Sequence, residues 1–68
     1  MGLMSILDAT GDTEVRWNDP ESEARARELF EDLRHRNYLA FEGKTGEHLR
    51  NFSADTEHMV MIPPIQGG

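Results

Sequence analysis

Cysteine is absent from this chain of 68 residues. Disulfide bridges and thiolate metal sites are therefore excluded, and the absence fits a reducing compartment such as the cytoplasm, where we expect the protein to reside. A domain of this length buries roughly 60% of the surface that its unfolded chain exposes. We therefore expect oligomerisation or a partner to contribute to its stability.

Long hydrophobic runs are also missing. No stretch approaches the ~20 apolar residues that a membrane-spanning helix needs, so we expect no membrane partner. The opening MGLMSI has neither the basic region nor the long apolar core of a secretory signal. It also departs from a myristoylation signal, because position six is Ile6 where that signal has Ser or Thr.

Basic residues are scarce: seven Lys and Arg stand against thirteen Asp and Glu, which gives a formal net charge of −6. A phosphate backbone repels an acidic surface, so nucleic acid is not an expected partner. A basic surface on another protein is a more plausible partner for this chain.

The hydrophobic pattern predicts one helix and five strands. Asp19 followed by Pro20 marks a helix start, and an apolar stripe at helical spacing continues to Leu33. Asn37 is a reasonable C-terminal cap for the helix. A turn at Thr10–Asp12 separates the first two strands, which form a hairpin. The predicted elements are strands at 3–9, 13–17, 38–41, 47–51 and 58–62, and a helix from Pro20 to about Arg36.

These elements predict a small α+β domain over residues 1–62, in the order ββαββ(β), with one helix packed on one face of a mixed sheet. Residues 59–62 are all apolar, which is typical of a central strand. The strand at 47–51 has Leu49 as its main core candidate and is expected at an edge. If the first and last strands pair in parallel at the centre, the fold is a β-grasp, as in ubiquitin. A sandwich with a simple meander is the alternative.

Enzyme motifs are not found. Gly43-Lys44-Thr45 resembles the end of a phosphate-binding loop, but Tyr38 stands where that loop needs a glycine. The three serines, Ser5, Ser22 and Ser53, lie in no recognisable nucleophile motif. We expect that the chain is not an enzyme by itself and uses no cofactor.

Metal binding is not expected either. The three histidines lie on separate predicted elements, and no carboxylate stands at ligand spacing beside a second histidine. These histidines are His35, His48 and His58.

The last six residues, 63–68, predict an extended tail. Pro63 and Pro64 cannot donate to a sheet ladder, so they end the last strand and direct the chain away from it. Gly67 and Gly68 have no Cβ and can follow backbone paths closed to other residues. Such a tail can enter a narrow tunnel in another protein and present the carboxylate of Gly68.

Residues 55–68 resemble the end of the molybdopterin-synthase small subunit and of related β-grasp sulfur carriers, including the thiamine type. The shared features are an acidic turn, an apolar last strand, Pro63-Pro64, two variable residues and Gly67-Gly68. The resemblance implies a ubiquitin-like fold, with Pro63 and Pro64 positioning the tail. It also implies that an E1-like adenylating enzyme activates Gly68 at the cost of ATP, with Gly67 as the required spacer.

A partner surface is expected on the sheet face that the helix leaves uncovered. Methionines suit adaptable contact surfaces. We expect Val60 and Ile62 to point one way and the methionines beside them the other, joined by residues of the first strand. This predicted surface consists of Met4, Ile6, Met59 and Met61. The alternative is that Trp17, Tyr38 or loop residues cover it.

The sequence thus leads to one main functional hypothesis. The chain is a ubiquitin-like carrier whose C-terminal glycine carboxylate is adenylated by a partner enzyme, for sulfur transfer or conjugation. The alternative is a noncatalytic structural or accessory subunit of a larger assembly, such as a phage virion or an enzyme complex.

Overall fold

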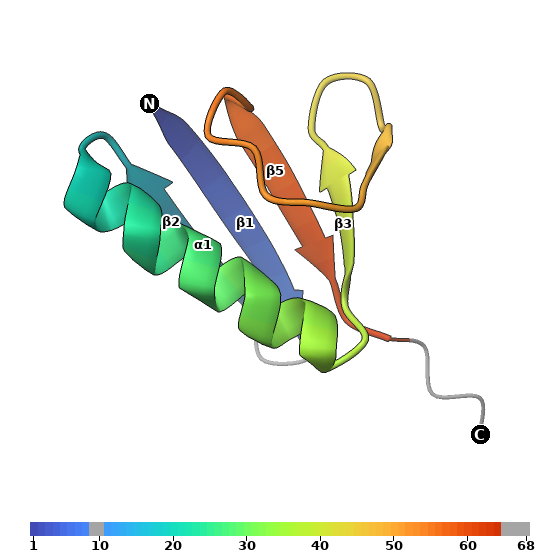
Figure 1. Ribbon diagram of the computed structural model, residues 1–68. Helices are drawn as coiled ribbons and strands as arrows, with labels where there is room; N and C mark the ends of the chain where they lie inside the picture. The colour runs from blue at the N-terminus through green and yellow to red at the C-terminus, as the bar shows by residue number, and fades with distance from the viewer. Residues whose placement is uncertain (9–10, 65–68) are drawn as a thin grey trace.

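A mixed sheet of five strands with one helix on one face forms the protein (Figure 1). The computed structural model describes residues 1–8 and 11–64. The predicted α+β class is confirmed. The elements in chain order are β1 (Gly2–Asp8), β2 (Gly11–Trp17), α1 (Pro20–His35), β3 (Leu39–Glu42), β4 (His48–Leu49) and β5 (His58–Ile62).

The strands lie side by side in the order β2-β1-β5-β3-β4. β1 and β5 are parallel, with Met4 opposite Met59, and every other pairing in the sheet is antiparallel. The expected central pairing of the first and last strands is therefore confirmed. So is the expected edge position of the strand that contains Leu49.

The start of α1 follows the predicted capping chemistry. The Asp19 carboxylate accepts a hydrogen bond of 2.7 Å from the Ser22 amide, and Pro20 occupies the first turn. In return the Ser22 hydroxyl accepts a hydrogen bond of 3.2 Å from the Asp19 amide. This reciprocal capping box satisfies two of the amides that a helix start leaves without an intrahelical partner.

The end of α1 is a Schellman motif. Asn37, directly after the C-cap residue Arg36, has a left-handed φ of 69°. The Tyr38 amide donates to the Leu33 carbonyl at 3.0 Å, and the Asn37 amide donates to the Arg34 carbonyl at 3.0 Å. The left-handed residue turns the chain from the helix into β3.

The core lies between α1 and the sheet. Trp17 and Phe30 are its largest fully buried side chains. The segment between β4 and β5 crosses β3 and β5 on the same side as α1 (Figure 1) and brings Phe52 to within 5.1 Å of the Trp17 ring and 5.9 Å of the Phe30 ring. The Trp17 indole N–H donates to the Ala54 carbonyl at 3.2 Å. The helix and this segment therefore together cover one face of the sheet.

The hairpin of β1 and β2 is tighter than the sequence suggested. Gly11 and Asp12, predicted as turn residues, belong to β2, and Gly11 pairs with Asp8. Ala9 and Thr10 lie outside the described residues. The strand predicted at 47–51 shortens to His48–Leu49, after a turn in which Gly46 has a left-handed φ of 74°.

Candidate functional site

The four residues predicted as a partner surface do share one face of the sheet, but it is the covered face. Met4, Met59 and Met61 have no exposed surface and Ile6 is 7% exposed. Met4 lies opposite Met59, and Ile6 opposite Met61, beneath α1 and the Phe52 segment. The prediction that these side chains face a partner is wrong, because they form the centre of the core.

The opposite face of the sheet therefore carries the residues that alternate with them. Leu39 is 43% exposed there, and the other apolar side chains are half-buried. Neither the core cluster nor the apolar side chains packed against it include any of them. We call this surface the open face; its apolar residues are Leu3, Leu7, Leu39, Phe41, Val60 and Ile62.

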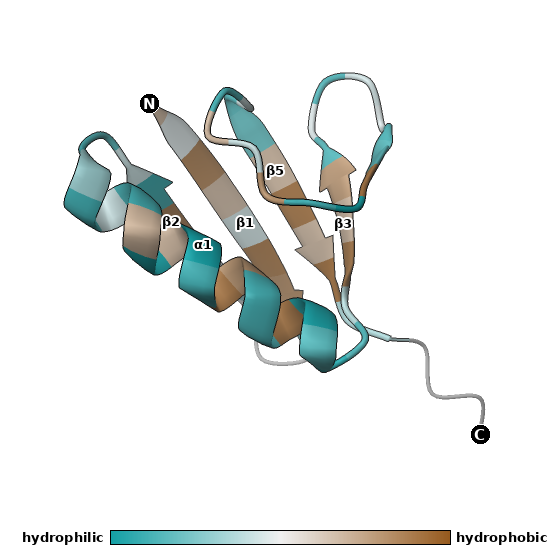
Figure 2. Cartoon of the chain, in the orientation of Figure 1, coloured by the Kyte–Doolittle hydropathy of each residue, from teal (hydrophilic) through white to brown (hydrophobic). Residues whose placement is uncertain are grey.

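The open face is continuous across the centre of the sheet. Phe41 on β3 lies opposite Val60 on β5, and Leu39 lies opposite Ile62. Figure 2 shows hydrophobic residues along β1, β5 and β3. Contiguous apolar surface on a small protein usually marks a contact site, so the open face is the strongest candidate for partner binding.

One polar pair interrupts the apolar residues of the open face. The Ser5 hydroxyl on β1 and Nε2 of His58 on β5 are 3.0 Å apart, a hydrogen bond that satisfies both half-buried groups. The Gly43 backbone packs so closely against the His58 ring that a Cβ on Gly43 would lie 2.5 Å from Nδ1. A hydroxyl beside an imidazole is also part of a nucleophilic site. Within the described residues, however, no carboxylate is hydrogen-bonded to the pair.

The tail leaves the sheet at the end of its central strand β5 (Figure 1). β5 ends at Ile62, an open-face residue, and is followed by half-buried Pro63 and exposed Pro64. Because β5 is flanked by β1 and β3, the chain leaves between two neighbouring strands. The two glycines predicted to be activated, Gly67 and Gly68, lie outside the described residues.

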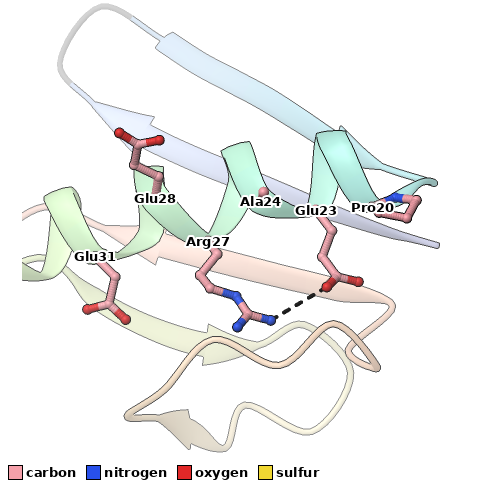
Figure 3. A pocket seen from close by; sticks show the side chains of 6 residues that line it. All are labelled: Pro20, Glu23, Ala24, Arg27, Glu28 and Glu31. Carbon is pink, nitrogen blue, oxygen red and sulfur yellow. Dashed lines mark ion pairs between the residues drawn. The ribbon is translucent and has the colours of Figure 1, made fainter.

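A shallow hollow on the outer side of α1 offers no comparable site. Figure 3 shows Glu23, Arg27 and Glu31 directed to one side of the helix and Glu28 to the other. Glu23 and Arg27 form an exposed ion pair at 3.5 Å, and Arg27 also lies 5.4 Å above the Phe52 ring. These side chains cover the helix and the Phe52 segment. The hollow is lined by Pro20, Glu23, Ala24, Arg27, Glu28 and Glu31.

Charged side chains near the β3–β4 turn are engaged with one another. The Lys44 ammonium donates to the Glu57 carboxylate at 2.6 Å, which lowers the pKa of Glu57 and raises that of Lys44. Hydrogen bonds from the Lys44 amide and from Thr45 lower the pKa of Glu42. These exposed contacts hold the turn closed and explain why Gly43-Lys44-Thr45 forms a turn.

Neither a metal-binding cluster nor a membrane-spanning helix is found among the described residues. In the stretches 1–8 and 11–64, no three His, Cys, Asp or Glu side chains gather closely enough to hold a metal ion. The one helix of these stretches, α1, is too short and too polar to cross a membrane.

Comparison with known proteins assigns no family to the chain. No protein-family model, curated protein or solved structure matches it. The resemblance carried by residues 55–68 therefore stays a prediction.

Proposed function

We propose that the protein is a β-grasp, ubiquitin-like carrier whose Gly68 carboxylate is activated by a separate adenylating enzyme. One observation carries the proposal. The central strand β5 runs parallel to β1, contributes Val60 and Ile62 to the open face, and continues directly into Pro63-Pro64. A docking surface and the base of the tail thus belong to one strand.

This arrangement suits delivery of a chain end to another active site. The ladder pairs β5 with strands on both sides, so the base of the tail is held in place. Pro63 and Pro64 have restricted φ angles and no amide hydrogen, so this part of the tail is stiff and cannot extend the sheet ladder. A partner that binds the open face can therefore receive the residues that follow at a fixed distance and direction.

The chemistry belongs to the partner and to ATP. The Gly68 carboxylate attacks the α-phosphorus of ATP, a C–O–P linkage forms, and pyrophosphate leaves. A sulfur nucleophile or an amine then attacks the carbonyl carbon, and AMP leaves. This chain supplies the carboxylate, and the glycines give a narrow approach with no side chain in the way.

The test measures ATP–pyrophosphate exchange by an E1-like adenylating enzyme encoded in the same genome. We expect exchange to require the chain ending at Gly68 and to stop when Gly67 and Gly68 are deleted. The same deletion should leave thermal unfolding unchanged, because residues 1–62 contain every strand and the helix found in the described part of the chain. Unaltered exchange with the shortened chain would refute activation at Gly68. Loss of a large assembly on the same deletion would favour a structural subunit.

A further inference from the structure

The outer edge of β2 is the one long strand edge that the described residues leave open. β2 has seven residues and pairs only with β1, whereas β4 at the other edge has two. An unpaired edge presents a row of backbone donors and acceptors that can accept another strand. Neither proline nor lysine, the residues that most often protect such edges, occurs in β2.

The ladder reveals which residues of β2 direct their backbone groups outward. The Leu3 amide on β1 donates to the Glu57 carbonyl at 3.0 Å, so the backbone groups of Leu3 face β5. Leu3 lies opposite Arg16 of β2. The two residues therefore form a non-hydrogen-bonded pair of the antiparallel ladder. The amide and carbonyl of Arg16 point to the free edge, and by alternation so do those of Glu14.

The side chains of these two residues carry opposite charges on the open-face side of β2. The Glu14 and Arg16 side chains are 54% and 76% exposed, and they form only a long contact of 3.9 Å with each other. Both remain accessible to a second charged strand. Val15, between them, points to the opposite side and is half-buried against the core.

We propose that the free edge of β2 pairs antiparallel with β2 of a second copy of this chain, so that Glu14 of each copy lies opposite Arg16 of the other. Both residues have outward backbone groups, so the two chains exchange hydrogen bonds at these pairs. Val15 then lies opposite Val15 of the second copy. We expect the added strand to come from a second copy of this chain, because each negative Glu14 then meets a positive Arg16.

Neighbouring registers are less favourable. One slip that keeps outward groups opposite one another sets Glu14 against Glu14 of the second copy, although it also sets Arg16 against Asp12. The slip in the other direction sets Arg16 against Arg16. Opposite charges across a strand pair stabilise it, and like charges destabilise it. Of these three registers, only the proposed one contains no like-charge pair, so the charges favour it. The pairing joins the two sheets into one and leaves β5 and the tail free, so it does not depend on the proposed carrier function.

A charge swap tests the register. The dimer dissociation constant is measured by sedimentation equilibrium for the wild type, Glu14→Arg, Arg16→Glu and the double variant. Each single change sets like charges opposite each other twice and should weaken the dimer about ten-fold or more. The double variant should restore it to within about three-fold. A wild-type chain that is monomeric at every soluble concentration, or a double variant as weak as the singles, would overturn the proposal.

A crosslink provides a second test that does not depend on charge. The Val15 pair has Cα atoms about 4.5 Å apart in a ladder of this kind, within the range that a disulfide bridges. Because the chain has no cysteine, Val15→Cys introduces a single thiol. Oxidation should give covalent dimers for Val15→Cys and few for Thr13→Cys, whose partner position is Trp17. Equal crosslinking of both variants would contradict the register, and circular dichroism verifies that each is folded.

Discussion

At the scale of single residues, Gly2 shows how closely the sheet packs against Trp17. A Cβ on Gly2 would lie 2.2 Å from Cζ2 of Trp17 and 2.7 Å from the Thr56 carbonyl oxygen. The indole has little room to retreat, because Trp17 is 2% exposed and hydrogen-bonded to Ala54. Gly2 is therefore required for close packing.

We predict that Gly2→Ala lowers the free energy of unfolding by about 1–3 kcal/mol, the range found when a packed core is overfilled. Urea unfolding followed by Trp17 fluorescence measures the loss. Gly43→Ala is the matched control, because its Cβ would meet the His58 ring, which is not part of the core cluster. It should destabilise less. Equal unfolding midpoints for Gly2→Ala and the wild type would refute close packing at Gly2.

The sequence placed Met4, Ile6, Met59 and Met61 on the wrong face of the sheet, and the register of the β1–β2 hairpin links these errors. A turn at Thr10–Asp12 pairs Ala9 with Thr13 and thus sets Leu7 opposite Val15. The structure instead pairs Asp8 with Gly11 and sets Met4 opposite Val15. Because successive strand residues face opposite sides, this change of register moves Met4 from the open face to the core. The apolar side chains on both faces of β5 gave no signal that could correct it.

The contact between Ser5 and His58 had no sequence signal either. Fifty-three positions separate the two residues, and neither belongs to a motif. The parallel pairing of β1 with β5 brings them together. Phe52 lies outside the predicted helix and strands, and nothing in the sequence showed that its ring packs between Trp17 and Phe30.

At the scale of elements, α1 was predictable almost to the residue because its signals are local. Asp19, Pro20 and Asn37 all act within a few positions of themselves. The amide of Ser22 donates to the Asp19 carboxylate and lowers its pKa below the usual 3.8. A carboxyl with a lowered pKa in the folded state adds stability above its unfolded pKa, and this stability is lost as the pH falls through the folded value.

We therefore predict that Asp19→Asn is less stable than the wild type at pH 7, and that the difference shrinks as the pH falls below about 4. Asparagine keeps an acceptor for the Ser22 amide but carries no charge to interact with the helix dipole. Urea midpoints of both proteins between pH 7 and pH 3 measure the difference. Subtracting one curve from the other removes the titration of Glu42 and Glu57, which both proteins share. A difference that stays constant over this range would show that the Asp19 charge contributes nothing.

At the scale of the whole molecule, the sheet has one face that forms the core and one whose apolar side chains stay partly exposed. The α+β class and the central β1–β5 pair follow from element order and from the apolar last strand. Which residues face the core and which face outward could be decided only from the register of the strand pairs. In the proposed function, the open face matters because it shares β5 with the tail.

We predict that Leu39→Glu weakens activation by the partner enzyme about ten-fold or more without unfolding the protein. Leu39 is the most exposed apolar residue of the open face, and a charge there must be desolvated when a partner binds. The control is Ala24→Glu, which adds the same side chain at an exposed position on the outer side of α1. Thermal unfolding and ATP–pyrophosphate exchange are measured for both variants. Equal exchange rates for the two variants would show that the activating enzyme does not bind the open face.

Activation at Gly68 is tested most directly by the mass of the C-terminal peptide after the chain is isolated from cells that express it with its own activating enzyme. We predict a fraction of chains with Gly68 converted to a thiocarboxylate or joined to an amine, and no such fraction when Gly67 carries a bulky side chain. An unmodified Gly68 in every chain, with the activating enzyme shown to be present and active, would contradict it.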